Sequence, residues 1–201
     1  MDTVGITIET TRLLIRDYKS DLSEIEEVFA FTGDPVVATH SSWGPLTREA
    51  TAEVLRSANQ SAVQNPRLIY QLAIVLRASN ALIGHASLLI NTSEMQEAKI
   101  GYTLHQDQWR RGYATETANA LLHFGFNRLK LHRMCATTAP TNVASRRVLE
   151  KIGMRQEGLL RKNVLQRGKW RDSLLFACIE DDFQELYSSL YDGELDEFSG
   201  E

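Results

Sequence analysis

A short basic loop at residues 109–116 has the residue types that hold an anion. Arg110 and Arg111 precede Gly112, and Ala114 follows, so two cations stand beside positions where a ligand can approach the backbone closely. A helical pattern opens at this loop, and the first turn of a helix carries unpaired N–H groups and about half a positive charge. Phosphate or pyrophosphate is the ligand that such an arrangement favours.

A second polar pair, Asn142 and Ser145, stands three residues apart at the start of a later helical pattern. Residues three apart in a helix share one face. On one interpretation, Asn142 caps the helix and Ser145 is a solvated serine of its first turn. On the other, the Asn142 amide holds the polar chain of a ligand and the Ser145 hydroxyl lies near a reacting atom. The local pattern leaves both interpretations open.

The elements that position these residues follow from the hydrophobic periodicity. A strand is predicted over residues 97–104, a helix over 112–126 and a further strand over 133–138. A helix over 142–152 comes next, and Gly153 ends it. A strand–helix–strand connection of this kind is right-handed and makes the strands locally parallel. The basic loop and the polar pair are therefore both attached to one parallel strand pair.

The remaining elements complete one mixed α/β domain around a largely antiparallel sheet. We expect this domain to span residues 1–190 and an acidic, mobile tail to occupy residues 191–201. The other expected elements are strands over 6–16, 68–76, 82–90, 154–161 and 170–180, and helices over 21–32, 47–64 and 181–190.

The composition excludes several classes of protein. The chain has 201 residues, of which 43% are hydrophobic, and a net charge of −4, which disfavours a general nucleic-acid binder. No apolar run approaches the roughly 18 residues of a membrane span, and no signal-peptide pattern opens the chain, so we expect a cytoplasmic protein without a membrane partner. Cys135 and Cys178 are expected as reduced core thiols, and no Cys/His cluster has zinc spacing, so we expect no metal.

Together the two polar segments make the chain resemble the GNAT superfamily of N-acetyltransferases, and more closely its RimJ/RimL branch, which includes acetyltransferases of ribosomal-protein N-termini. The superfamily signature Gln/Arg-x-x-Gly-x-Gly/Ala falls on residues 109–114, where the branch carries glycine in place of Arg110. The branch signature Asn-x-x-Ser-x-Arg-x-Leu-Glu-Lys-x-Gly-Phe is met from Asn142 to Gly153, with Met154 for the Phe. Shorter matches follow the family's order at residues 11–16, 34–35, 82–84, 100–102, 157–161 and 168–173.

This resemblance implies the GNAT acyl-CoA N-acyltransferase fold, in which a mixed, mostly antiparallel sheet holds acetyl-CoA in a wedge between two splayed parallel strands. It implies that Leu104 holds the pantetheine arm and polarises the thioester carbonyl, and that Asn142 also bonds the pantetheine. Glu116 would repel phosphate, so we expect its carboxylate to point away from the cofactor. The residues implied to bind the pyrophosphate are Arg110, Arg111, Gly112, Tyr113, Ala114 and Thr115.

The implied reaction is direct transfer of the acetyl group from sulfur to a primary amine. It needs a neutral amine, a stabilised oxyanion and a proton for the leaving thiolate. Many family members carry a tyrosine for the last task where this chain has Leu149, so Ser145, one turn earlier, is the expected substitute at the cofactor sulfur. A glutamate frequent in the family is Lys99 here. The base is therefore expected to act through a water chain, from Glu97 on the same strand face or from His85 or Ser87 on the preceding strand.

The acceptor side carries the weakest signals. We expect Trp43, His85 and Trp170 to line the acceptor cleft. The acceptor is either a protein N-terminus or a small-molecule amine, and the enzyme is a monomer or homodimer. A non-catalytic acyl-CoA-binding module of the same fold stays open as an alternative, because Lys99 and Leu149 replace the usual base and acid.

Overall fold

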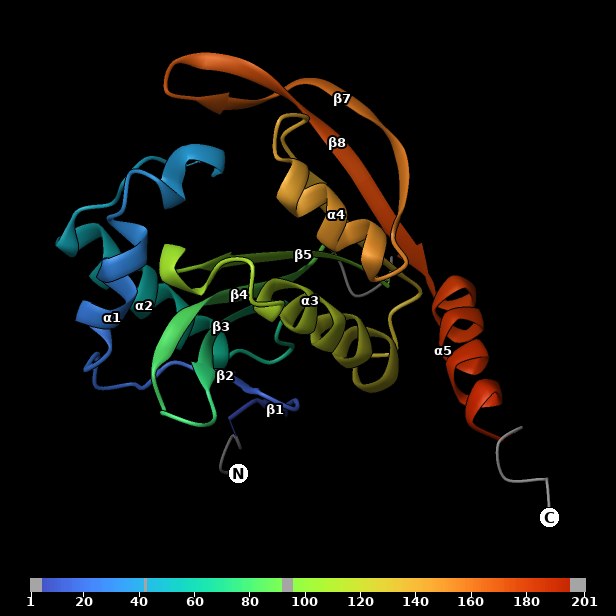
Figure 1. Ribbon diagram of the computed structural model, residues 1–201. Coiled ribbons are helices and arrows are strands. Elements are labelled where there is room, and N and C mark those ends of the chain that lie inside the picture. The colour runs from blue at the N-terminus through green and yellow to red at the C-terminus, as the bar shows by residue number, and fades with distance from the viewer. Residues whose placement is uncertain (1–4, 42, 92–95, 196–201) are drawn as a thin grey trace.

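The computed structural model describes residues 5–41, 43–91 and 96–195, and it shows one eight-stranded sheet with helices on both faces (Figure 1). The mixed α/β class predicted from the sequence is confirmed. The strands are β1 (Thr7–Glu9), β2 (Leu13–Asp17), β3 (Ile69–Leu76), β4 (Leu82–Ile90), β5 (Glu97–Leu104), β6 (Arg133–Thr138), β7 (Arg155–Gln166) and β8 (Lys169–Ile179). The helices are α1 (Ile25–Thr32), α2 (Arg48–Ala62), α3 (Tyr113–His123), α4 (Val143–Lys151) and α5 (Glu180–Leu195), with short turns η1 (Val37–His40), η2 (Gln106–Gln108) and η3 (Phe124–Arg128).

The strand order is β1-β2-β3-β4-β5-β6-β8-β7, and only β5 and β6 run parallel among these neighbours. These are the two strands that the sequence predicts as a parallel pair. Their pairing covers only Glu97 to Lys99 of β5. Beyond this point β5 continues along β4 to Leu104, whereas β6 continues along β8. The parallel pair therefore splays, and the C-terminal half of β5 is hydrogen-bonded to a neighbour on one side only.

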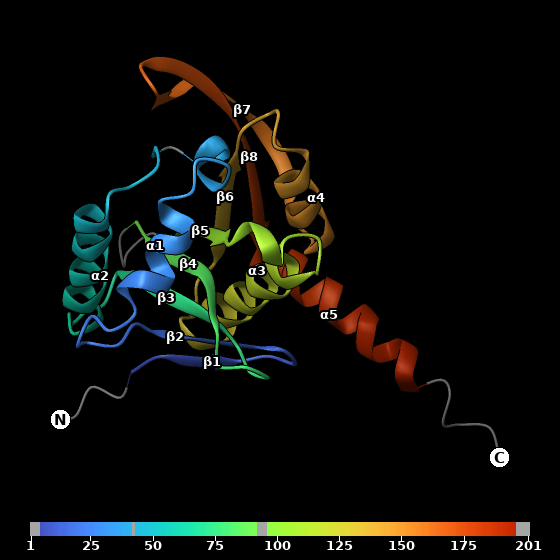
Figure 2. The same ribbon diagram turned by 60° about the vertical axis from the view of Figure 1, so that its left-hand side comes forward.

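Separate apolar cores cover the two faces of the sheet. Leu121 and Leu122 of α3 are fully buried in the core that includes Leu13 and Ile74. On the other face, α1 and α2 bury a second core that includes Ala73. Figure 2 shows α1 and α2 on the opposite side of the sheet from α3. The sheet thus lies between two separate apolar cores.

The N-terminal strand expected over residues 6–16 is in fact two antiparallel strands, β1 and β2. Thr10 closes the turn between them, because its N–H donates to the Leu13 carbonyl at 3.0 Å and its hydroxyl accepts from the Leu13 N–H at 2.9 Å. Apolar alternation continues on both sides of this turn, so the pattern alone does not reveal the break. The first helix also begins later than expected, at Ile25.

The last helix, α5, runs on to Leu195 and so includes the first residues of the expected tail at 191–201. Residues 196–201 lie outside the described residues, and the mobility of the tail stays a prediction. No helix in the described part of the chain is long and apolar enough to cross a membrane. The same residues hold no group of three or more His, Cys, Asp or Glu side chains that could bind a metal ion.

Candidate active site

The backbone of β5 presents free polar groups where β6 leaves it. The His105 N–H donates to the Ile83 carbonyl at 2.8 Å, which marks a hydrogen-bonded pair at the end of the β4–β5 ladder. Hydrogen-bonded and non-hydrogen-bonded pairs alternate in an antiparallel ladder, so the N–H and C=O groups of Tyr102 and Leu104 point away from β4. The Leu104 carbonyl accepts the Trp109 indole N–H at 2.9 Å. The Leu104 N–H and the backbone N–H and C=O of Tyr102 remain directed toward the gap where β6 diverges from β5, which we call the splay.

Two hydroxyl groups meet on the α3 side of the splayed strands. The Tyr102 hydroxyl of β5 lies 3.2 Å from the Ser145 hydroxyl in the first turn of α4. Burial raises the pKa of Tyr102 to about 12, although the Ser145 hydrogen bond lowers it slightly. Tyr102 therefore keeps its proton at neutral pH. The pair brings together one residue that the sequence analysis assigns to the site and one that it misses.

Ser145 is positioned by the N-cap of its own helix. The Asn142 side-chain oxygen accepts the Ser145 N–H at 3.1 Å, so Asn142 caps α4. Of the two interpretations of Asn142, the capping one is confirmed, and it uses only the oxygen of the amide. The amide NH₂ is the group that a pantetheine contact would use, and that contact stays a prediction.

The basic loop adopts the conformation that an anion site at a helix N-terminus requires. Gly112 is the N-cap of α3, has a left-handed φ of 83° and supplies no side-chain hydrogen bond to the first turn. The first-turn N–H groups, from Tyr113 to Thr115, are thus left without a side-chain cap. Arg110 and Arg111 are both exposed beside them. The structure brings the whole predicted loop together at the C-terminal end of β5.

Arg110 lies in a backbone conformation that favours glycine. Its φ is 60°, in the left-handed region that a residue with a Cβ adopts only at a cost of roughly 1–2 kcal/mol. A glycine would adopt this φ without that cost. The turn thus carries an exposed cation where glycine would be the unstrained residue.

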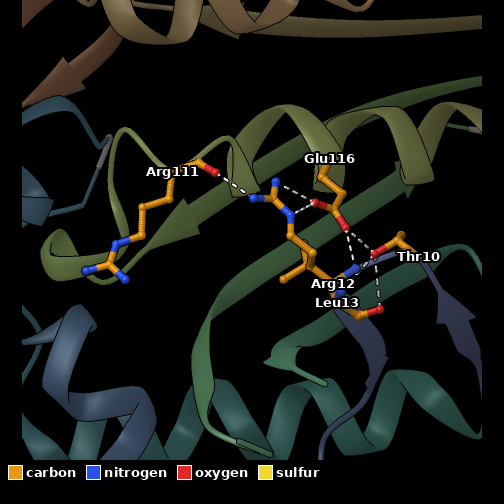
Figure 3. Close-up of polar contacts among 5 residues, drawn as sticks. All are labelled: Thr10, Arg12, Leu13, Arg111 and Glu116. Atoms are coloured by element: carbon orange, nitrogen blue, oxygen red, sulfur yellow. Dashed lines mark hydrogen bonds and ion pairs between the residues drawn. The ribbon is translucent and has the colours of Figure 1, made fainter. Parts of the chain in front are cut away.

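Glu116 turns its carboxylate away from the loop and toward the start of β2 (Figure 3). Its oxygens accept the Thr10 hydroxyl at 2.7 Å, the Arg12 N–H at 2.8 Å and the Arg12 Nε at 2.7 Å. Burial alone would raise the pKa of Glu116, but these hydrogen bonds outweigh burial and lower it. The carboxylate is therefore charged and fully engaged by Thr10 and Arg12 on this side.

Glu97 lies at the wrong end of β5 for the role of base. It pairs with Arg133 across the only part of the sheet where β5 and β6 touch, with Oε2 3.0 Å from the Arg133 Nε. Its other oxygen accepts the Asn91 side-chain amide at 2.8 Å. Leu104 is seven residues further along the strand, or roughly 23 Å away. We therefore withdraw Glu97 from the catalytic residues. Its side chain lies on the expected face of β5, but it is too far along the strand from Leu104 to act there.

The face of β4 and β5 that looks toward α1 and α2 is polar and carries no carboxylate at the splay. His85 is paired with Ala73 of the α1/α2 core and with Thr103, so both His85 and Thr103 lie on this face. Ser87 and Gly101 follow at the next paired position. Burial lowers the pKa of His85 to about 4, which leaves its imidazole neutral at pH 7. Its Nδ1 lies 2.9 Å from the hydroxyl of Tyr18, a partner that the sequence does not predict.

The two tryptophans expected at the acceptor cleft have different surroundings. Trp43 packs against the core beneath α1 and α2. Trp170 is 60% exposed near the tip of the β7–β8 hairpin, paired with Leu165. The neighbouring residue Gln166 donates its side-chain amide to the Thr39 carbonyl of η1 at 3.0 Å. Neighbouring strand positions face opposite sides, so Trp170 lies on the hairpin face opposite Gln166, and its place in the acceptor cleft stays a prediction.

The hydrogen bond from Gln166 ties the tip of the hairpin to the segment between α1 and α2. The arch that the β7–β8 hairpin makes toward η1 is visible in both views (Figures 1 and 2). No sequence signal singled out Gln166, because its partners are backbone carbonyls more than a hundred residues away.

A cavity of about 480 Å³ opens at β1 and the outer face of α3. Its lining includes Thr10, Glu116 and His123 but no residue of β5, β6 or α4. It is therefore separate from the splayed strands and from Ser145.

Comparisons with known proteins show the family of the chain. A family model described as an acetyltransferase (GNAT) domain matches residues 12–155. The uncharacterized N-acetyltransferase YnaD of Bacillus subtilis is 33% identical over 177 residues, which cover 88% of this chain and 98% of that protein. The crystal structure of a GNAT-family acetyltransferase from Bacillus anthracis is 32% identical, covers 88% of this chain and 99% of its own, and superposes with a TM-score of 0.77. The ribosomal protein uS5-alanine N-acetyltransferase of Escherichia coli is 29% identical over 84 residues, or 42% of this chain and 43% of that protein.

Proposed function

The chain belongs to the acetyltransferase (GNAT) family, and on that premise we propose that it transfers the acetyl group of acetyl-CoA to the α-amino group of a polypeptide N-terminus. The observation that carries the proposal is the splay of β5 from β6 with the Ser145 hydroxyl beside it. The splay leaves polar backbone and a hydroxyl group at the place where a thioester is bound in this family.

The donor fits the groups that the chain supplies. The backbone of Tyr102 and Leu104 directs polar groups toward the splay. These groups can form hydrogen bonds with the amides of a pantetheine arm. The uncapped N–H groups at the start of α3, with Arg110 and Arg111 beside them, suit a pyrophosphate. The amide NH₂ of Asn142 adds one further donor from α4.

The chemical step needs few catalytic groups from the protein. The amine nitrogen attacks the thioester carbonyl carbon, the carbon–sulfur bond breaks and the sulfur leaves as a thiolate. The nitrogen releases one proton to solvent water. Ser145 donates a hydrogen bond to the thiolate, and a backbone N–H of β5 stabilises the oxyanion. The acid need not be strong, because a thiolate is a stable leaving group compared with an alkoxide.

The acceptor class is inferred from the described residues of β4 and β5 beside the splay, none of which is a carboxylate. Glu97 is engaged by Arg133, and His85 is too weakly basic to deprotonate an amine at pH 7. An enzyme so built needs an acceptor that is already partly neutral. A protein α-amino group has a pKa about two units lower than that of a lysine side chain, so its neutral fraction near pH 7 is at least about a hundredfold larger. The similarity to an alanine N-acetyltransferase points the same way.

The test is acetyl transfer to a matched set of amines. The purified protein, acetyl-CoA and each amine are incubated while thiol release is recorded, and mass spectrometry locates the acetyl group. The set comprises a peptide with a free N-terminus and no lysine, the same peptide with a blocked N-terminus and one lysine, and a polyamine. Ser145→Ala serves as the slowed control.

We expect acetylation of the free N-terminus and at least about tenfold slower transfer to the lysine peptide and the polyamine. Preferential acetylation of the polyamine or of lysine would refute the proposed acceptor. Binding of CoA without thiol release from any amine would instead refute catalysis and favour a non-catalytic acyl-CoA-binding module.

A further inference from the structure

We propose that Arg12 is a positioning residue for the pyrophosphate of acetyl-CoA, and this inference rests on the proposed function. Arg12 precedes β2 and is a hundred residues away from the basic loop in the sequence, yet it contacts that loop and the first turn of α3 (Figure 3). It holds the loop in shape and balances the charge of Glu116 in the first turn of α3.

The first part of this role is mechanical. The Arg12 guanidinium donates to the Arg111 carbonyl at 2.9 Å, which restrains the residue just before Gly112. The same guanidinium lies over the Tyr113 ring, 4.6 Å from the ring centroid, and so contacts the residue just after Gly112. An added Cβ on Gly112 would meet Arg12 at 3.1 Å. Arg12 therefore contacts the loop on both sides of its left-handed glycine.

The second part is electrostatic. Glu116 lies in the first turn of α3, where a negative charge suits the helix dipole but opposes a bound pyrophosphate. Arg12 forms an ion pair with Glu116 at 2.7 Å, and its backbone N–H and the Thr10 hydroxyl complete the set of donors around the carboxylate. The Arg12 guanidinium thus neutralises the Glu116 carboxylate and holds it toward β2, while the same guanidinium restrains the loop.

Only arginine can make this set of contacts. A planar guanidinium can bond a carboxylate and a carbonyl while it stacks on a ring, whereas a lysine ammonium is a compact point charge. The Arg12 side chain is 45% exposed, so the ion pair alone would be worth little; its effect comes from the loop that it holds. We therefore expect Arg12→Lys to keep the positive charge but to lose most of the effect on the pyrophosphate-binding loop.

The primary experiment is calorimetric titration of CoA into the wild type, Arg12→Gln, Arg12→Lys and Arg48→Gln. The last is a matched control, because Arg48 also forms an exposed ion pair, with Glu26 at 2.6 Å, but joins α2 to α1. We expect the Kd for CoA to be about tenfold higher in both Arg12 variants. In Arg48→Gln, the Kd should change by less than about twofold. An Arg12→Gln protein that binds CoA within twofold of the wild type overturns the inference.

A second measurement separates positioning from general damage. Acetyl-pantetheine has the thioester but no pyrophosphate, so it serves as the alternative donor. We expect Arg12→Gln to raise KM for acetyl-CoA with little change in kcat, and to change kcat/KM for acetyl-pantetheine by less than about twofold. Equal losses on the two donors would mean that Arg12 is merely structural. If Arg12→Gln does not fold, Arg12→Lys is measured in the same way.

The two proposals fail in distinguishable ways. A wild-type protein that binds CoA but acetylates no amine refutes the proposed function, while the CoA titrations still decide the role of Arg12. An active wild type with unchanged CoA binding in the Arg12 variants refutes the role of Arg12 alone.

Discussion

The Tyr102 hydroxyl lies 3.2 Å from the Ser145 hydroxyl, and this contact connects β5 to α4 beside the splay of the parallel strands. Because its pKa is raised to about 12, Tyr102 remains a donor at neutral pH. When Tyr102 donates to the Ser145 oxygen, the Ser145 proton is directed to a different acceptor. In the proposed reaction, that acceptor is the thiolate of CoA.

The first prediction concerns this pair of hydroxyls. We expect Ser145→Ala to lower kcat at least about tenfold with little change in KM for acetyl-CoA, and Tyr102→Phe to lower kcat by a smaller factor because the serine remains. The double variant should be no slower than Ser145→Ala, because Tyr102 acts through Ser145. Steady-state thiol release measures all three, and losses that multiply would show that the hydroxyls act independently.

Glu97 is predicted to contribute to stability and not to catalysis. Glu97→Gln removes one partner of the Arg133 ion pair, which is about three-quarters buried at both side chains. We expect a loss of about 1 kcal/mol in the free energy of unfolding and a kcat within about twofold of the wild type. Denaturant unfolding and thiol-release rates on the same preparation test this. A tenfold fall in kcat with normal stability would restore Glu97 as the base.

Arg110 is predicted to add affinity for the phosphates of CoA. Arg110→Gly keeps the left-handed turn at a φ of 60° and removes only the cation. We expect the Kd for CoA to rise about threefold at low salt and the difference to shrink at high salt, because an exposed charge is screened. Titration at two ionic strengths measures the effect. An unchanged Kd at low salt would mean that Arg110 is only solvated surface.

The fourth prediction concerns acid stability and His85. Burial lowers the pKa of His85 from 6.5 to about 4 in the folded chain, so between these values the unfolded chain binds a proton that the folded chain does not. The stability that is present above pH 6.5 is therefore lost as the pH falls toward 4, by up to about 3 kcal/mol. Denaturant unfolding at pH 7.5, 6 and 5 measures the slope. In His85→Gln, the free energy of unfolding should depend less steeply on pH. An equal dependence in both proteins would mean that another group takes up the proton.

The local chemistry of the site was readable from the sequence because it depends on residues close together in the chain. A glycine that follows two arginines at the start of a helix pattern is enough to predict an anion site with open N–H groups, and the structure shows that Gly112 is the left-handed N-cap of that helix. The same holds for Asn142 and Ser145, which the helical repeat places on one face. The strand–helix–strand order likewise predicted the parallel pair of β5 and β6.

Only the tertiary structure decided which of these groups meet. Tyr102 and Ser145 are 43 residues apart, and Arg12 and Glu116 are 104 apart, so their contacts depend on how α3 and α4 pack against the sheet. Glu97 was assigned to the correct strand, but the position of the splay along β5 excludes it from the site. Periodicity specifies which face a side chain occupies, whereas packing and register specify how far along the strand its partners lie, and catalysis depends on that distance.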